Sequence, residues 1–398
     1  MSADLLYSET ETDLRNALRD LLTDQSSPDR VRALLESPET ADADLWHTVA
    51  AGIGIAGLLI PEPLGGAGAS YRELATAAEE FGAAAAPVPY LGSAAVATAA
   101  LLSAARASAA RTDEAALPSP AAHLLKQMAD GGLTAALAID FAACPGGPRG
   151  PAARVSAARP GDAADGVTRL RGTIPAVADA LLADVLLVPA DGVPEALYVV
   201  ETNAPGVHRT PVVSLDMTRQ LCDITLDDVP ARRVAGGADA ETAVTAGLNA
   251  GAAILAAEQL GLAQRCLDMT VAYVKERHQF ARPVGSFQAL KHRLADVWTA
   301  ITQARAASRY AAAYLADGDP ASPGWDGPVA VALAKSACSE AAVLAAEECV
   351  QLHGGIGFTW EHPAHVYLKR AKASSVGFGS AGAHRSALAA LVNLPAPG

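Results

Sequence analysis

The sequence predicts an α+β protein in which a small antiparallel β domain lies between two helical domains. Apolar side chains recur at helical spacing in residues 1–131 and again in residues 237–398. Residues 132–236 instead carry short β-like runs separated by Gly, Pro, Asp and Asn. Hydrophobic residues make up 51% of the 398 positions, which is enough apolar material for a full-size core and excludes a disordered chain.

The N-terminal helical domain is expected over residues 1–131. A leucine series between residues 14 and 22 lies on one helical face. A loop rich in Pro and Gly follows at residues 58–68, since proline cannot continue a helix and glycine tolerates positive φ. Two further helices are expected, over residues 71–82 and 93–109.

The middle domain is expected over residues 132–236, as a small antiparallel sheet. Its clearest strands are residues 186–188, 196–200 and 222–226, separated by turn-forming residues. Residues 144–164 are rich in Pro, Gly, Ala and Arg, which predicts an exposed loop.

The C-terminal domain is expected over residues 237–398, as a four-helix bundle. Residues 241–277, 285–317 and 326–353 show apolar periodicity over lengths near 30 residues. Short Gly- and Pro-containing connections join them, and two shorter helices follow. Long antiparallel helices with such connections are typical of bundles.

Composition excludes several classes of partner. The chain has 43 acidic and 30 basic residues, a net charge of −13, so nucleic acid and anionic membrane surfaces are not expected partners. The N-terminus lacks the pattern of a secretion signal, and apolar stretches such as residues 248–257 are too short to span a bilayer. We therefore expect a cytoplasmic protein.

A metal site or disulfide framework is not expected. No cysteines form a CxxC pair, and small buried thiols in a reducing compartment explain them. His353, His362 and His365, with Glu361, offer a rival metal constellation, but a glycine-rich turn separates His353 from His362. The five cysteines are Cys144, Cys222, Cys266, Cys338 and Cys349.

One segment with binding potential lies between two of the predicted long helices. It places Arg277, Gln279 and Phe280 before a turn fixed by Pro and Gly, and Gln288 follows. A guanidinium is suited to bidentate phosphate binding. Taken alone, a solvated arginine at a helix end beside a packed phenylalanine explains the segment equally simply.

A second segment ends another long helix with Gln351, Gly354 and Gly355. Glycines let a ligand approach backbone N–H groups closely. The alternative is an ordinary glycine helix cap.

Together and in this order, the motifs resemble those of the acyl-CoA dehydrogenase family, and the resemblance covers nearly the whole chain. Helical, β and helical domains follow the family's order too. The matching segments are residues 59–68, 79–82, 260–268, Arg277-x-Gln279-Phe280, Phe287-Gln288, 294–296 and 351–357.

The resemblance implies an FAD cofactor bound across a subunit interface. It also implies α,β-dehydrogenation of an acyl-CoA substrate by a carboxylate base, with electron-transfer flavoprotein as the acceptor. The family has Gly where this chain has Ala281, which is tolerable if φ there is negative. The residues implied to reach the ADP half of a neighbouring subunit's flavin are Arg277, Gln279, Phe280, Gln288, Gln351, Gly354 and Gly355.

The catalytic carboxylate is missing from both positions at which the family carries it. Phe378 stands at the usual position and Gly251 at the alternative one. Glu258 lies two turns along the same helical face and is the candidate base. The competing interpretation makes Glu258 a partly buried carboxylate paired with a neighbouring helix. Glu241 lies further away.

The middle domain also departs from the family. Residues 138–147 lack the hydroxyl and Gly-Ser-Asp features that line the flavin ring, so that half-site looks degraded while the half lent to a neighbour looks intact. Residues 214–219 and 351–362 resemble an actinobacterial subgroup whose members often act as heterotetramers on CoA thioesters of sterol side chains. Asp216 and Arg219 are expected to form a structural pair, with a substrate role as the alternative.

The leading hypothesis is a hetero-oligomeric subunit that completes the FAD site of a paralogous subunit. The first alternative is a flavin-free structural or regulatory subunit. The second is a homo-oligomer of altered chemistry, using Glu258 or no carboxylate.

Overall fold

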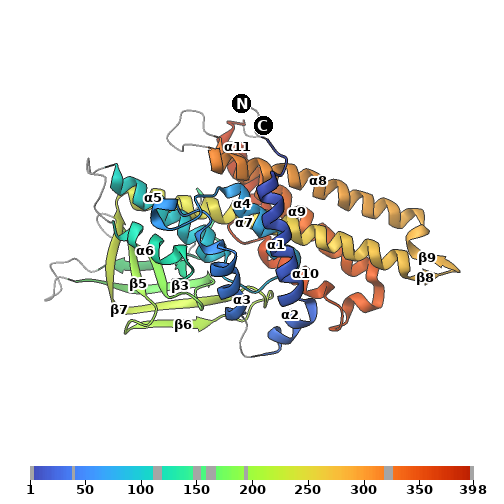
Figure 1. Ribbon diagram of the computed structural model, residues 1–398, viewed down its shortest axis with the longest axis horizontal. Coiled ribbons are helices and arrows are strands. Elements are labelled where there is room, and N and C mark those ends of the chain that lie inside the picture. Colours follow the sequence, from blue (N-terminus) through green and yellow to red (C-terminus); the bar gives the residue numbers. More distant parts are fainter. Residues whose placement is uncertain are drawn as a thin grey trace.

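The computed structural model describes residues 4–37, 41–110, 119–146, 154–157, 167–191, 196–317 and 326–394. The predicted order of helices, sheet and helices is confirmed. Figure 1 shows the sheet at one end of the molecule and the long C-terminal helices extending toward the other.

Within the described residues, six α-helices form the N-terminal region. Two of them start with a capping box, in which a serine and a glutamate three residues later satisfy each other's backbone N–H groups: Ser8 with Glu11, and Ser70 with Glu73. The helices are α1 (Glu9–Gln25), α2 (Pro28–Leu35), α3 (Ala43–His47), α4 (Tyr71–Ala84), α5 (Thr98–Ala109) and α6 (Pro120–Ala129).

The middle region forms a mixed sheet, so the prediction of a purely antiparallel domain is wrong at one pair. Strand β1 runs parallel to β4, with Ala135 opposite Val185. Parallel neighbours need a long crossover, and residues 138–184 supply it. The strands are β1 (Ala135–Leu137), β2 (Arg154–Ala157), β3 (Thr168–Ala178), β4 (Val185–Ala190), β5 (Ala196–Glu201), β6 (Val207–Pro211) and β7 (Leu221–Gly236).

The sheet order is β1-β4-β5-β7-β3-β2, and β6 pairs with β7. Strand β2 lies inside the stretch 144–164 that the sequence predicts as a loop, and its Val155 is buried. Residues 147–153 and 158–164 of that stretch lie outside the described residues.

In the part of the C-terminal region that the structure describes there are five α-helices, and the central one, α9, packs against the other four. A hairpin of β8 (His278–Gln279) and β9 (Arg282–Pro283) joins α7 to α8 and projects away from the sheet (Figure 1). The helices are α7 (Ala238–Glu276), α8 (Gln288–Asp317), α9 (Gly327–His353), α10 (Ala364–Ser374) and α11 (Ala381–Leu391).

Helices α4 and α7 cross with their backbones in contact. A Cβ on Gly261 would lie 1.8 Å from the Glu79 carbonyl oxygen, and one on Gly82 would lie 2.0 Å from that of Glu258. Only glycine fits at both points. The crossing therefore holds the N-terminal region against α7.

Two helical stretches, Leu91–Ala109 and Gly327–Phe358, are long and apolar enough to pass for membrane spans. The prediction that apolar stretches are too short is wrong for these two. In each, 67% of the most apolar window is buried inside the protein, and core helices meet the same criterion.

Candidate functional site

The β8–β9 hairpin presents its functional residues outward. Phe280 is 87% exposed and meets Phe287 edge to face, with the ring centroids 6.1 Å apart. The guanidinium of Arg282 lies 3.9 Å from the Phe287 ring centroid. The Arg277 side chain is exposed and makes no hydrogen bond or ion pair with the residues that the structure describes. Its guanidinium is therefore available to an external anion.

The backbone of this hairpin is strained at Ala281. Its φ is +61°, and that of Phe280 is +53°. Ala281 is expected to be tolerable in place of the family's glycine if its φ is negative. Its φ is positive, so that condition is not met. The left-handed region costs an alanine about 1–2 kcal/mol relative to its ordinary conformation.

The second motif lies at the end of α9. Gly354 has a φ of +62°, and a Cβ on either Gly354 or Gly355 would meet no atom within 4 Å. Gln351 is exposed on the last turn. The backbone here borders open space, as a cradle for a phosphate group requires.

Aromatic stacking brings the two motifs to the same end of the bundle. Tyr273, near the end of α7, stacks on His353 at the end of α9 with a centroid separation of 4.5 Å. Gln288, at the start of α8, contacts His292 at 2.8 Å. An unpaired cation, exposed amides and open glycines therefore share one surface, which fits a pyrophosphate-containing ligand.

The three histidines of the rival metal constellation stack on other rings. The ring centroids of His353 and His362 lie 4.3 Å apart with the rings tilted, and the His365 ring stacks on Trp360. His353 Nδ1 lies 2.6 Å from the carbonyl oxygen of Cys349. Within the described residues, no group of three or more His, Cys, Asp and Glu side chains could hold a metal ion.

The region around the usual base position is closed. Phe378 is 3% exposed, and its N–H donates a hydrogen bond of 2.7 Å to the Phe141 carbonyl oxygen. The two rings meet edge to face at 5.4 Å. The cavity beside them holds about 10 Å³, which is too small for an acyl chain. The two segments that the resemblance places on either side of substrate and flavin thus contact each other directly.

Glu258 lies in a buried ionic cluster. Its side chain accepts hydrogen bonds from Arg219 Nη2 at 2.5 Å and from Arg370 Nε at 2.9 Å, and also from the Tyr90 hydroxyl. Burial alone raises the pKa of Glu258, but the two guanidiniums outweigh it and lower that pKa to about 2.

This environment favours the competing interpretation of Glu258, a paired structural carboxylate, over a catalytic base. A base must reach the substrate's α-proton, but Glu258 is fully buried and both its oxygens bind arginines. A carboxylate with so low a pKa is also a weak proton acceptor. Glu258 therefore has the surroundings of a structural ion pair, while Glu241 lies exposed in the first turn of α7.

The predicted pair of Asp216 and Arg219 does not form. Arg219 reaches α7 instead, where it binds Glu258, and its Nη1 lies 3.9 Å from Asp179. Asp216 accepts hydrogen bonds from the backbone N–H and the hydroxyl of Thr218.

Sequence reasoning missed Arg370 as a member of the ionic cluster. It lies in a stretch with Lys369 and Lys372 that reads as an exposed basic helix. The sequence did contain a signal that Arg370 is buried, because it shares a helical face with the apolar residues Val366 and Tyr367.

Comparison with known proteins places these features in a family. Residues 8–112 match the N-terminal domain of acyl-CoA dehydrogenase, and residues 241–392 match the C-terminal domain of acyl-CoA dehydrogenase. The acyl-CoA dehydrogenase IpdE2 of Mycolicibacterium smegmatis is 34% identical over 368 residues, which cover 92% of this chain and 94% of that protein.

Two solved structures are similar over almost their full length. The steroid acyl-CoA dehydrogenase Tcur3481-Tcur3483 matches with 32% identity and a TM-score of 0.78, covering 97% of this chain and 98% of the other. The ChsE4-ChsE5 complex from Mycobacterium tuberculosis matches with 28% identity and a TM-score of 0.81, covering 99% of this chain and 100% of the other.

Proposed function

This chain belongs to the acyl-CoA dehydrogenase family, and we propose that it serves that family's reaction as a subunit that completes the FAD site of a paralogous partner. FAD is the family's cofactor, and the reaction is the α,β-dehydrogenation of an acyl-CoA thioester. Bound FAD supplies the hydride acceptor, and the protein supplies placement.

The proposal rests on the contrast between the closed pocket at Phe378 and the exposed residues at the end of the bundle. We call these residues, Arg277–Gln288 and Gln351–Gly355, the arm. The Phe378 N–H donates a hydrogen bond to the Phe141 carbonyl oxygen, so the usual base position contacts the segment that matches the flavin-lining segment of the family. The Arg277 side chain and the Gly354–Gly355 backbone stay free at the far end of the bundle. A chain of this kind can lend its arm to a partner but has no room for its own acyl group.

The residues of the arm fit the ADP half of FAD. Arg277 would bind a pyrophosphate oxygen as a charged fork, and the N–H groups near Gly354 and Gly355 would donate to the same group. Gln279, Gln288 and Gln351 would donate amide hydrogen bonds, and Phe280 would cover the ligand from the hairpin. The catalytic carboxylate would then come from the partner.

The nature of the similar proteins supports a partner and a substrate class. One similar structure is a complex of two named chains, and the other is named a steroid acyl-CoA dehydrogenase. We therefore propose a heterotetramer acting on the CoA thioester of a sterol-derived acyl group. Electron-transfer flavoprotein would accept the electrons.

Co-expression with a candidate paralogous subunit tests this proposal. The chain is purified alone and with that paralogue, and flavin is measured from the visible absorbance bands while light scattering gives the mass. We expect flavin only in the mixed assembly. Full flavin in the chain alone would indicate a self-sufficient homo-oligomer, and a flavin-free mixed assembly would indicate a structural subunit. Either result overturns the proposal.

A further inference from the structure

We propose that this chain has a second small-molecule site, for a ligand bearing carboxylate or phosphate oxygens, in the cavity bounded by α1, α4, α7, α8 and α10. The cavity has a volume of about 480 Å³. Its lining shares no residue with the closed pocket at Phe378 or with the arm at Arg277. The site is therefore separate from the flavin and acyl-CoA chemistry.

Two of the three carboxylates that line the cavity are paired with arginines. Glu79, 5% exposed on α4, accepts hydrogen bonds from Arg15 at 2.6 Å and from the Tyr7 hydroxyl at 2.9 and 3.0 Å. Its neighbour Glu80 accepts two from the Arg19 guanidinium, at 2.9 and 3.0 Å.

The third carboxylate of the lining belongs to Asp268. It accepts a hydrogen bond of 2.8 Å from the amide of Gln264, one turn earlier on α7. Two of the three carboxylates are thus paired with arginines and, among the described residues of the lining, only Asp268 keeps an oxygen free, which disfavours a cationic ligand.

Two arginines of the same lining keep free binding capacity. Arg265, on α7, forms no ion pair with a carboxylate in the described parts of the chain. Arg305, on α8, donates to Gln264 at 2.8 Å and approaches Glu79 only to 3.8 Å. Four arginines against three carboxylates leave the lining with one net positive charge. Guanidinium forks with spare donors select carboxylate and phosphate oxygens.

An unpartnered hydroxyl lies beside the cavity. Ser26 borders the cavity where α1 ends, it is 4% exposed, and its Oγ has no hydrogen-bond partner among the described residues. Buried polar atoms almost always have partners. The Ser26 Oγ has less than 1 Å² of accessible surface, so a ligand oxygen in the cavity would partner it only after the side chain rotates.

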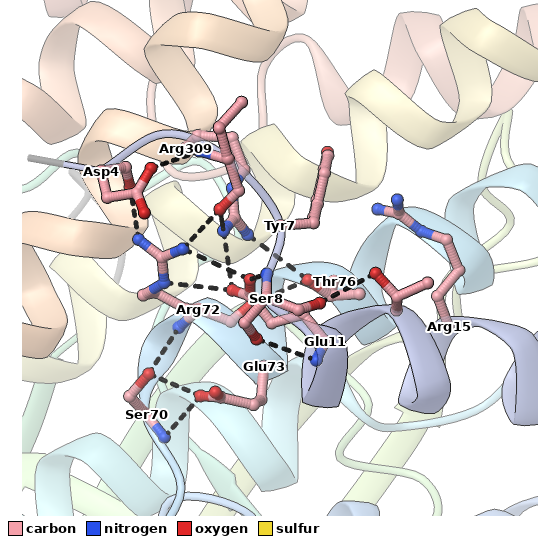
Figure 2. A network of polar contacts seen from close by, with 12 residues as sticks. Asp4, Tyr7, Ser8, Glu11, Arg15, Ser70, Arg72, Glu73, Thr76 and Arg309 are labelled. Atoms are coloured by element: carbon pink, nitrogen blue, oxygen red, sulfur yellow. Dashed lines mark hydrogen bonds and ion pairs between the residues drawn. The ribbon is translucent and has the colours of Figure 1, made fainter.

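The cavity is coupled to the segment that precedes α1. Figure 2 shows Tyr7 between Arg309 and Arg15, whose guanidinium carbons lie 4.2 and 4.0 Å from the Tyr7 ring centroid. Arg309 and Arg72 both donate to the Leu6 carbonyl oxygen, at 3.1 and 2.7 Å. Because Tyr7 also binds Glu79 at the cavity wall, a bound ligand should hold this segment more firmly.

Calorimetric titration of the full chain, in the assembly in which it purifies, tests the site with two probes, succinate and inorganic phosphate. Ionic strength is held constant with chloride. We expect saturable binding of at least one probe, at least ten-fold weaker in Arg265→Gln. Arg171→Gln, at an exposed arginine on β3, is the matched control and should bind like wild type. Succinate alone would identify a carboxylate ligand, phosphate alone a phosphate ester, and both a general anion site.

Hydrogen exchange provides the second readout, which does not depend on flavin. The bound probe should slow exchange of backbone amides at residues 6–11 and leave those in β3 unchanged. Arg305→Gln should also weaken binding, which keeps the test decisive if Arg265→Gln is unstable. Absence of saturable binding by either probe, or equal affinity in wild type and both variants, overturns the proposal.

Discussion

The ring of Phe378 occupies the space that a side chain on Gly251 would need. An ideally placed Cβ on Gly251 would lie 2.7 Å from Cζ of Phe378, well inside van der Waals contact. These are the two positions at which members of the family carry their catalytic base. In this chain the Phe378 ring therefore excludes a carboxylate side chain at position 251.

Truncation of the Phe378 ring should destabilise the chain strongly. Phe378→Ala removes a buried ring and leaves a cavity, at a cost of about 3–5 kcal/mol in the free energy of unfolding. Gly251→Glu should also destabilise the chain, because its side chain meets that ring. Urea denaturation of the two single variants and the double variant measures their coupling.

The double variant should be more stable than the sum of the two single effects predicts, since the glutamate partly fills the space left by the ring. Phe358→Ala is the control, because Phe358 is exposed and its loss should cost less than about 0.5 kcal/mol. Strict additivity at positions 251 and 378 would contradict the packing described for them.

Removal of the Arg277 guanidinium should weaken FAD retention in the mixed assembly. A lost hydrogen bond to a charged group corresponds to about 1.5–3 kcal/mol, or about a 10- to 100-fold increase in the Kd for FAD. Fluorimetric titration of the apo-assembly measures this. Arg171→Ala should leave the Kd unchanged, and an unchanged Kd for Arg277→Ala would remove Arg277 from the cofactor site.

Relief of backbone strain in the hairpin should stabilise the protein. Glycine accepts the φ of +61° at position 281 without the penalty that alanine meets there. Ala281→Gly should therefore raise the free energy of unfolding by up to about 1 kcal/mol. The matched change Ala295→Gly, inside the exposed face of α8, should lower it by about the same amount. A loss of stability in both variants would mean that φ is not strained at Ala281.

The buried cluster around Glu258 should make the protein sensitive to acid. The pKa of Glu258 is lowered to about 2 in the folded chain from an ordinary value of 4.5. Between these values the unfolded state binds a proton that the folded state does not, so stability falls as the pH falls. The full effect is about 3 kcal/mol, present above pH 4.5 and lost as the pH approaches 2.

Glu258→Gln separates this structural role from catalysis. The variant should lose about 3–5 kcal/mol at neutral pH, because Arg370 is left buried without its carboxylate and Arg219 keeps only Asp179, 3.9 Å away. It should also lack the corresponding part of the acid dependence. Turnover by the folded mixed assembly should stay within a few-fold of wild type, and Glu340→Gln, at an exposed ion pair, serves as control. Complete loss of turnover in correctly folded Glu258→Gln would restore it as the base.

Periodicity in the sequence was sufficient to predict the long helices. Residues 241–277 were expected, and α7 spans Ala238–Glu276, because one helix carries its own signal over many turns. Pairings between distant residues carry no such signal. The parallel β1–β4 pair and the bond between Arg370 and Glu258, 112 residues apart, exist only once the chain has folded.

The candidate site likewise has some features that the sequence predicts and others that only the fold creates. Arg277–Gln288 and Gln351–Gly357 are local motifs and could be recognised as they stand in the sequence. The missing carboxylates at 251 and 378 were visible too, but their mutual contact was not. The backbone bond from Phe378 to Phe141 also joins segments that only tertiary structure brings together.

The contact between Gly251 and Phe378 also bears on how such a chain evolves. A glutamate that arises at position 251 meets a phenyl ring, and a smaller residue at 378 leaves a void, so each single step back toward a carboxylate should lower the stability of the fold. Only simultaneous changes at positions 251 and 378 avoid this loss of stability. Under the proposed function, the loss of the carboxylate is therefore hard to reverse by single substitutions. The chain stays dependent on the partner that supplies one.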